Sequence, residues 1–300
     1  MKKLLFTILI LCVMITVISC GEKHDENTVI IIGGHDVTRD EYTYFYENTK
    51  LDHNSDVDSN LLDTLKRYCA VYTLAKQCGV KLTEEMNAAI DEEIQVTIDS
   101  FGGEEGYNAA LLETFMTADV YRKILENEEL EIAVREYLTN EFTSNIKADD
   151  AAVEADFNAN FVRATHILIV RNNGLTDEEN RKLAEDLHAR ILNGEDFETL
   201  QKEYGQDIGI DYKNGYYITR GMFNEAFEDT AYALKDNEMS GVVESSVGFH
   251  IIKRLPLEIE YLYSRFEDVR YIYKNRVINE RLDDIAGKLS VEYIEATEET

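Results

Sequence analysis

Two histidines stand out because they lie inside apolar stretches of the sequence. His166 occurs within residues 164–170 and His250 within 249–255, and both stretches have the composition of buried strands. A histidine in an apolar strand is most often a structural residue whose ring nitrogens are hydrogen-bonded. A neutral imidazole can also donate from one nitrogen and accept at the other, which suits it to a polar network beside a substrate. The residues alone leave both interpretations open.

The other four histidines lie in polar stretches, where we expect solvated side chains: His24, His35, His53 and His188. No serine and histidine combine with an acid in a recognisable hydrolase motif, and there is neither a phosphate-binding glycine loop nor a dinucleotide fingerprint. No group of cysteines and histidines has the spacing of metal ligands. We therefore expect neither a metal ion nor a cofactor.

Cysteine usage gives no sign of a disulfide framework. Cys69 and Cys78 are nine residues apart on one expected helix, which separates them by about 13 Å. A disulfide needs Cα atoms within about 7 Å of each other. We therefore expect two free, half-buried thiols.

The composition narrows the functional classes. The 300 residues are 44% hydrophobic, which allows a packed core. The formal net charge is -29, and the acidic residues are spread along the whole chain. A nucleic-acid-binding protein needs the opposite sign of charge. An anionic membrane surface would also repel this chain, so attachment to a membrane requires a dedicated anchor.

Residues 1–19 are predicted to be a targeting segment. A basic start precedes the apolar run 4–18, which is shorter than the about 20 apolar residues that a transmembrane helix needs. The run stops at Cys20, after a small residue, and this resembles a bacterial lipobox. An ordinary secretory signal with a chance cysteine is the alternative. With 20–27 as a polar tether, we expect a lipid-anchored protein on the extracytoplasmic face of a bacterial cell membrane.

The first half of the remaining chain has a helical pattern. A short strand is expected at 29–32, and a helix is expected to begin at Thr38, which can form a capping box with Glu41. From about 60 to 142, apolar residues recur at spacings of three and four without a strand pattern. This favours a helical domain.

The hydrophobic period changes near residue 162. The expected order within 164–255 is strand, helix, short helix, strand, helix, strand and strand, which describes a small α+β domain with an antiparallel sheet. After Pro256, one amphipathic helix to about 289 cannot bury its apolar stripe alone. We expect it to return to the first helical region. The α+β domain is then an insertion in a helical domain built from both ends of the chain.

Four stretches of this central region resemble the parvulin family of peptidyl-prolyl cis-trans isomerases, in the family's order and with similar spacing. They are RATHILIV at 163–170, NGEDFETL at 193–200, TRGMFNEAF at 219–227, and EMSG at 238–241 running on to VGFHII at 247–252. The resemblance implies a four-stranded antiparallel sheet with surrounding helices. By architecture alone, the flanking helices and the lipobox resemble the PrsA-type foldase lipoproteins and, more distantly, the SurA-type chaperones.

The resemblance implies catalytic roles for three polar residues. His166 and His250 match the two family histidines, and their strands lie side by side in the fold, so the two imidazoles are expected to face each other beneath the substrate. Asp207 matches a position that holds Cys or Asp in the family. A residue that merely caps a turn is the alternative for Asp207.

The resemblance also implies a proline pocket. Phe227 matches its aromatic floor, although a phenylalanine at helical spacing is ordinarily a core residue. Ser245 matches a small hydroxyl residue on the wall. Phe223 replaces a usual Met, which makes the pocket aromatic on two sides and could tighten or partly block it. The segment 208–214 lacks the family's Gly-Asp-Leu-Gly run, so the wall near Tyr216 is left undefined.

We therefore expect a prolyl isomerase that acts at X–Pro segments of exported, still-unfolded polypeptides. Residues 171–174 lack the basic cluster that a phosphate-directed parvulin needs. The alternatives are a holdase chaperone with an inactive or auxiliary parvulin domain and a purely structural surface lipoprotein. The oligomeric state, a homodimer included, is open. The expected domains are 1–19 signal peptide, 20–27 tether, 28–157 helical chaperone-like domain, 158–257 parvulin domain and 258–300 C-terminal helix packing on the N-terminal domain.

Overall fold

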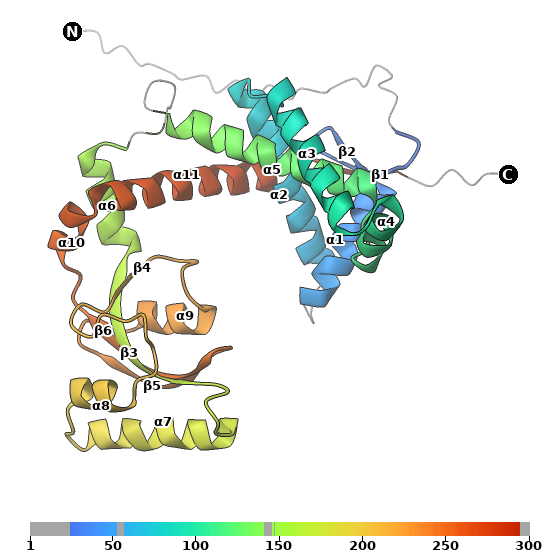
Figure 1. The fold of residues 1–300 in the computed structure, drawn as a ribbon. Helices are drawn as coiled ribbons and strands as arrows, with labels where there is room; N and C mark the ends of the chain where they lie inside the picture. The colour runs from blue at the N-terminus through green and yellow to red at the C-terminus, as the bar shows by residue number, and fades with distance from the viewer. Residues whose placement is uncertain (1–24, 53–56, 141–145, 147, 295–300) are drawn as a thin grey trace, which may run out of the picture. The chain divides into compact units, whose positions relative to one another are not determined.

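The computed structural model describes residues 25–52, 57–140, 146 and 148–294. The chain divides into two compact units, one of Met1–Tyr137 with Glu280–Thr300 and one of Leu138–Asn279. Each unit combines helices with an antiparallel sheet (Figure 1), which confirms the α+β class and the insertion of one unit in the other. The bounds differ from the expected 157/158 and 257/258, because two helices run from one unit into the other. These are α5 (Ala118–Thr139) and α11 (Phe266–Lys288).

Both ends of the described chain meet in the sheet of the first unit. Its strand order is β2-β1-β7, from β2 (His35–Thr38), β1 (Thr28–Ile32) and β7 (Val291–Tyr293). The sequence predicts only β1. The other two strands have four and three residues, and both pair with β1.

The other elements of the first unit are helical. They are α1 (Arg39–Asp52), α2 (Val57–Cys78), α3 (Glu84–Ser100), α4 (Glu104–Glu113) and α5. Apolar side chains of β1, β2 and α2 form a core, against which Leu289 and Val291 pack. Cys69 and Cys78 are both free, as predicted, and Cys78 is half-buried. Cys69 is fully buried rather than half-buried, because it lies in the core of the first unit. Burial raises the pKa of the Cys69 thiol to about 12.

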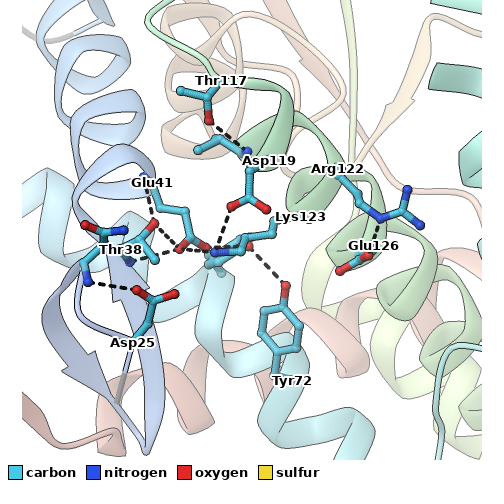
Figure 2. A network of polar contacts seen from close by, with 12 residues as sticks. Asp25, Thr38, Glu41, Tyr72, Thr117, Asp119, Arg122, Lys123 and Glu126 are labelled. Carbon is cyan, nitrogen blue, oxygen red and sulfur yellow. Dashed lines mark hydrogen bonds and ion pairs between the residues drawn. The ribbon is translucent and has the colours of Figure 1, made fainter. Parts of the chain in front are cut away.

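A buried carboxyl group joins β2, α1 and α5 (Figure 2). The side chain of Glu41 has no exposed surface and pairs with Lys123 Nζ at 3.0 Å. Its Oε2 also accepts hydrogen bonds from the N–H and hydroxyl of Thr38 at 2.9 and 2.7 Å. Thr38 Oγ1 accepts from the Glu41 N–H at 3.4 Å, so the predicted capping box is present. A buried carboxylate is stable only when paired and hydrogen-bonded in this way.

One histidine that was expected to be solvated is half-buried. The ring of His35 stacks on the ring of Tyr72 with centroids 4.1 Å apart. Burial lowers the pKa of His35. The prediction was wrong because Tyr72 comes from α2, so the residues next to His35 in the sequence give no sign of the contact.

The second unit contains a four-stranded antiparallel sheet with the order β4-β3-β6-β5. The strands are β3 (Val162–Val170), β4 (Tyr216–Ile218), β5 (Met239–Glu244) and β6 (Gly248–Leu255). Helices α7 (Asp177–Leu192) and α8 (Phe197–Tyr204) lie on one side of it and α9 (Glu225–Ala233) on the other (Figure 1). The number and pairing of strands agree with the expected sheet.

Alternation along β3 and β6 divides their side chains between the two faces. Ile167 and Ile251 pack in a core with side chains of α7 and α8. Ala164 and Ile252 pack in a second core with Phe227 of α9 and its neighbours. Even-numbered positions of both strands therefore face α9, and these positions include the two histidines.

A third apolar cluster lies beside the sheet. It joins α6 (Asp150–Asn160) to α10 (Ile259–Ser264) and the start of α11, with Phe157, Leu262 and Val269 buried at its centre. The start of the segment 258–300 packs on α6, most of which lies within the expected helical domain 28–157. The structure places both α6 and α10 in the second unit, whereas Leu289 and Val291 pack in the core of the first unit.

Candidate active site

Strand pairing brings the two histidines together on the α9 face. His166 lies opposite Ile252 and His250 opposite Leu168, so the histidines are diagonal neighbours across β3 and β6. Their Nδ1 atoms are 3.0 Å apart, and the side chains are only 4% and 3% exposed. At this distance, one Nδ1 must carry a proton and the other must accept it.

Asp207 lies at one end of the histidine pair. Its Oδ2 is 2.7 Å from His166 Nε2 and accepts a hydrogen bond from the Tyr216 hydroxyl at 2.9 Å. Its Oδ1 accepts from the Gly209 N–H at 2.9 Å. The hydrogen bond from His166, supported by those from Gly209 and Tyr216, lowers the pKa of Asp207 to about 2. Asp207 is therefore a carboxylate at neutral pH.

Ser245 lies at the other end of the pair. Its Oγ is 2.8 Å from His250 Nε2 and accepts a hydrogen bond from the Val247 N–H at 3.2 Å. Burial, with a smaller effect of the neighbouring His166, lowers the pKa of His250 to about 3. His250 is therefore a neutral imidazole at neutral pH.

These four side chains form one continuous hydrogen-bonded chain in the order Ser245, His250, His166 and Asp207. The carboxylate can only accept, so His166 donates from Nε2. With His166 Nδ1 assigned as the acceptor, His250 donates from Nδ1 and accepts at Nε2 from the Ser245 hydroxyl. Every donor in this arrangement is directed toward Asp207.

Aromatic rings cover the polar chain. Phe227 is 1% exposed, and its centroid lies 5.1 Å from that of His166 and 5.4 Å from that of His250. Phe223 is half-buried, and its ring centroid lies 5.2 Å from that of Phe227 and 4.9 Å from that of Tyr216. A ring held between two others needs about 7 Å between their centroids. A pyrrolidine ring therefore cannot enter between Tyr216 and Phe223 as they stand, and it must lie on the outer side of Phe223 or displace it.

Glu228, a buried acid that was not predicted from the sequence, holds the loop before α9. Glu228 is 4% exposed, and its two carboxyl oxygens accept hydrogen bonds from the N–H groups of Gly221 and Phe223 at 3.0 and 2.7 Å. Glu228 follows Phe227 directly, so one turn of α9 supplies both the pocket floor and the anchor of the loop. The signal available in the sequence was an acid adjacent to a predicted core aromatic.

The segment that lacks the family run forms a turn of its own. The Asp211 side chain accepts from the Lys213 and Asn214 N–H groups at 2.9 and 3.1 Å. Gly215 follows with φ of 64°, and a Cβ there would lie 2.5 Å from the Ala164 carbonyl oxygen. This turn places Tyr216 next to Asp207. The Tyr216 hydroxyl donates a hydrogen bond to Asp207, so the side chain does not form a free pocket wall.

The loop after β3 offers no cationic cluster. Arg171 pairs with Asp177 and with Glu244, and Arg181 pairs with the same glutamate. These guanidinium groups are already paired with carboxylates, and the expectation that the site does not recognise phosphate stays a prediction.

The structure thus brings together the seven predicted site residues of the second unit: His166, Asp207, Tyr216, Phe223, Phe227, Ser245 and His250. Their catalytic roles stay predictions. Cys20 lies outside the described residues, as do His24 and His53.

Over the described part of the chain, no three histidine, cysteine or acidic residues are grouped so as to hold a metal ion. None of the helices described there is long and apolar enough to cross a membrane.

Residues 151–255 match the family of the PPIC-type PPIASE domain. The chain is 24% identical over 315 aligned residues to the foldase protein PrsA of Caldanaerobacter subterraneus subsp. tengcongensis, covering 95% of this chain and 94% of that protein. It is 32% identical over 173 residues to the foldase protein PrsA of Staphylococcus aureus. That match covers 55% of this chain and 51% of the relative, so it spans about half of each protein.

Two solved structures are also similar. The foldase protein PrsA from Streptococcus pneumoniae is 21% identical, with 87% of this chain and 91% of that chain covered and a TM-score of 0.37. NmPin, the parvuline of Nitrosopumilus maritimus, is 35% identical over 33% of this chain and 98% of its own, with a TM-score of 0.26.

Proposed function

Because residues 151–255 belong to the PPIC-type peptidyl-prolyl isomerase family, in a chain of the PrsA foldase type, we propose that the polar chain and the aromatic rings described above are its catalytic site. The chain is a peptidyl-prolyl cis-trans isomerase and a folding factor for exported proteins. The observation that carries the assignment of the site is the unbroken hydrogen-bonded chain from Ser245 to Asp207 beneath Phe227.

The reaction requires no covalent step. Rotation about an X–Pro bond crosses a barrier of about 18–20 kcal/mol. A site that binds the twisted amide better than either planar form lowers this barrier, and each 1.36 kcal/mol of preference is worth about tenfold in rate. The task of the site is therefore to hold the proline ring and to disfavour the planar amide.

The two parts of the site divide this task. The outer side of Phe223, above the buried Phe227, offers an apolar surface to the pyrrolidine ring. The Asp207 carboxylate accepts a hydrogen bond from Tyr216, whose ring contacts Phe223. Its negative charge near the substrate would disfavour the partial negative charge that a planar amide carries on its oxygen. The histidines hold Asp207 and the pocket floor in place. They act electrostatically and by orientation, and neither has to exchange a proton with the substrate.

A protease-coupled assay on a proline-containing tetrapeptide tests the proposed function. The wild-type protein should accelerate cis-to-trans conversion, and Asp207→Ala should lower kcat/KM by at least about tenfold, the equivalent of one charge-assisted interaction. His166→Gln should cost less, because an amide can still donate to Asp207. Thermal unfolding of each variant controls for loss of the fold. A folded wild-type protein without activity would support the holdase alternative and sink the catalytic proposal.

We also propose that Cys20 carries the lipid and places the protein on the extracytoplasmic face of a bacterial cell membrane. The support is the sequence, in which the apolar run 4–18 stops at Cys20 and a polar tether follows. Metabolic labelling with a fatty-acid analogue should mark the wild-type protein, whereas Cys20→Ser should be unlabelled and soluble. Labelling that persists in Cys20→Ser would contradict this anchor. A homodimer stays a prediction, which sedimentation of the purified protein tests.

A further inference from the structure

A groove of about 380 Å³ lies next to the loop that carries Phe223. One wall is formed by residues 219–222 of that loop. The other is a face of α11 that includes Tyr271, Asn275 and Asn279, which recur every four residues on successive helical turns, together with Arg276. Both walls belong to the second unit, so the groove is a feature of that unit alone.

Two apolar side chains of the groove are exposed to solvent rather than packed in a hydrophobic core. Met222 is 52% exposed and Tyr271 is 65% exposed. The Met222 side chain is held in place, since its Sδ accepts a hydrogen bond from the Thr219 N–H at 3.4 Å. Adjacent exposed apolar side chains of this kind, set around a depression, are typical of a binding surface.

The charged groups of the groove already have partners. Arg220 pairs with Asp229, and Arg276 pairs with Asp156 of α6. Because both guanidinium groups are neutralised, the groove is not suited to capture an anion such as a phosphate or a free carboxylate. Its chemistry fits an uncharged occupant, which makes apolar contacts with Met222 and Tyr271 and hydrogen bonds with the surrounding polar groups.

The groove shares a loop with the proposed proline site, since its last residue on that loop, Met222, precedes Phe223. Met222 is bonded directly to Phe223, and Glu228 holds the N–H groups on either side of Met222. An extended polypeptide advances about 3.3–3.6 Å per residue. A client whose proline lies against Phe223 would reach the groove about two to four residues along its chain.

We infer that this groove is a subsite for the client polypeptide, which takes an apolar side chain lying two to four residues from the isomerised proline. The inference rests on the proposed function, because the proline must occupy the site at Phe223 for the same chain to enter the groove. It assigns Tyr271 a role in selecting clients, and it predicts that unfolded segments with an apolar residue near proline are preferred.

Exchange NMR on synthetic peptides tests this subsite. One substrate is a tetrapeptide, and the others are ten-residue peptides with a single Leu placed two, three or four positions to either side of the proline. We expect at least one Leu position to raise kcat/KM above that of the tetrapeptide by about three- to tenfold, the range of one well-packed aromatic contact. Tyr271→Ala should remove this advantage, and Tyr271→Phe should retain it. The matched control is Tyr263→Ala on α10, because Tyr263 is 63% exposed and lies outside the groove.

Amide shifts of the labelled protein supply a readout that does not depend on catalysis. Titration with the preferred ten-residue peptide should move the signals of Gly221 and Tyr271, and titration with the tetrapeptide should leave Tyr271 in place. A protein inactive on every peptide would defeat the proposed function, while the shifts would still decide the subsite. A ten-residue advantage that survives in Tyr271→Ala, an absent advantage, or unmoved Tyr271 signals would overturn the inference.

Discussion

At the scale of single residues, the buried His250 makes stability depend on pH. Its folded pKa of about 3 lies below its ordinary value of 6.5, so between these values the unfolded chain binds a proton that the folded chain does not. The contribution of the neutral His250 to the free energy of unfolding is fully present above pH 6.5. It decreases by up to about 1.4 kcal/mol per pH unit as the pH drops through this window. Urea unfolding at about pH 7 and pH 5 should show a smaller loss for His250→Gln than for the wild-type protein. Equal losses in the two proteins would contradict a neutral buried His250.

Phe223 is a second single residue with a testable role, because its ring limits the width of the proline site. It contacts both Tyr216 and Phe227, so a proline ring has to displace it or use its outer side. Phe223→Met replaces a flat ring with a flexible chain that can move aside. Because the proline ring packs on the outer side of Phe223, we expect KM for the tetrapeptide to rise by about two- to fivefold, less than the equivalent of 1.4 kcal/mol. A lowered KM would instead show that the Phe223 ring is an obstacle that the proline has to displace.

At the scale of elements, α9 positions the loop that forms the mouth of the site. Glu228 accepts from the N–H groups of Gly221 and Phe223, whereas a glutamine offers only one acceptor oxygen. Glu228→Gln should therefore loosen the loop and raise KM by about three- to tenfold with a smaller change in kcat, since the net contribution of one hydrogen bond is about 0.5–1.5 kcal/mol. The control is Glu225→Gln in the same helix, where the side chain is exposed. A loss of kcat alone would argue that Glu228 acts on the chemistry rather than on the loop.

At the scale of the whole molecule, the two units have separate cores and separate buried polar clusters. Lys123→Met leaves the fully buried Glu41 without its cation, which should destabilise the first unit by about 3 kcal/mol. The site of the second unit contains none of these residues. Calorimetry should show a lowered transition for the first unit, and tetrapeptide activity measured below that transition should be retained. Adding Glu41→Gln to Lys123→Met should recover part of the loss, because the unpaired charge is then absent. A parallel loss of activity in Lys123→Met would show that the units fold as one.

The sequence by itself determined the class of fold and most of the site. Long motifs such as RATHILIV carry both a strand pattern and a histidine, so the pairing that places His166 beside His250 followed from local residues and the family resemblance. The short strands β2 and β7 were not predicted, because they are stable only where β1 pairs with them. Tertiary structure alone decided that His35 stacks on Tyr72, that Tyr216 donates to Asp207, and that Glu228 holds the loop. Each of these contacts joins different structural segments, and its stability depends on burial and hydrogen-bond geometry that no local stretch of sequence records.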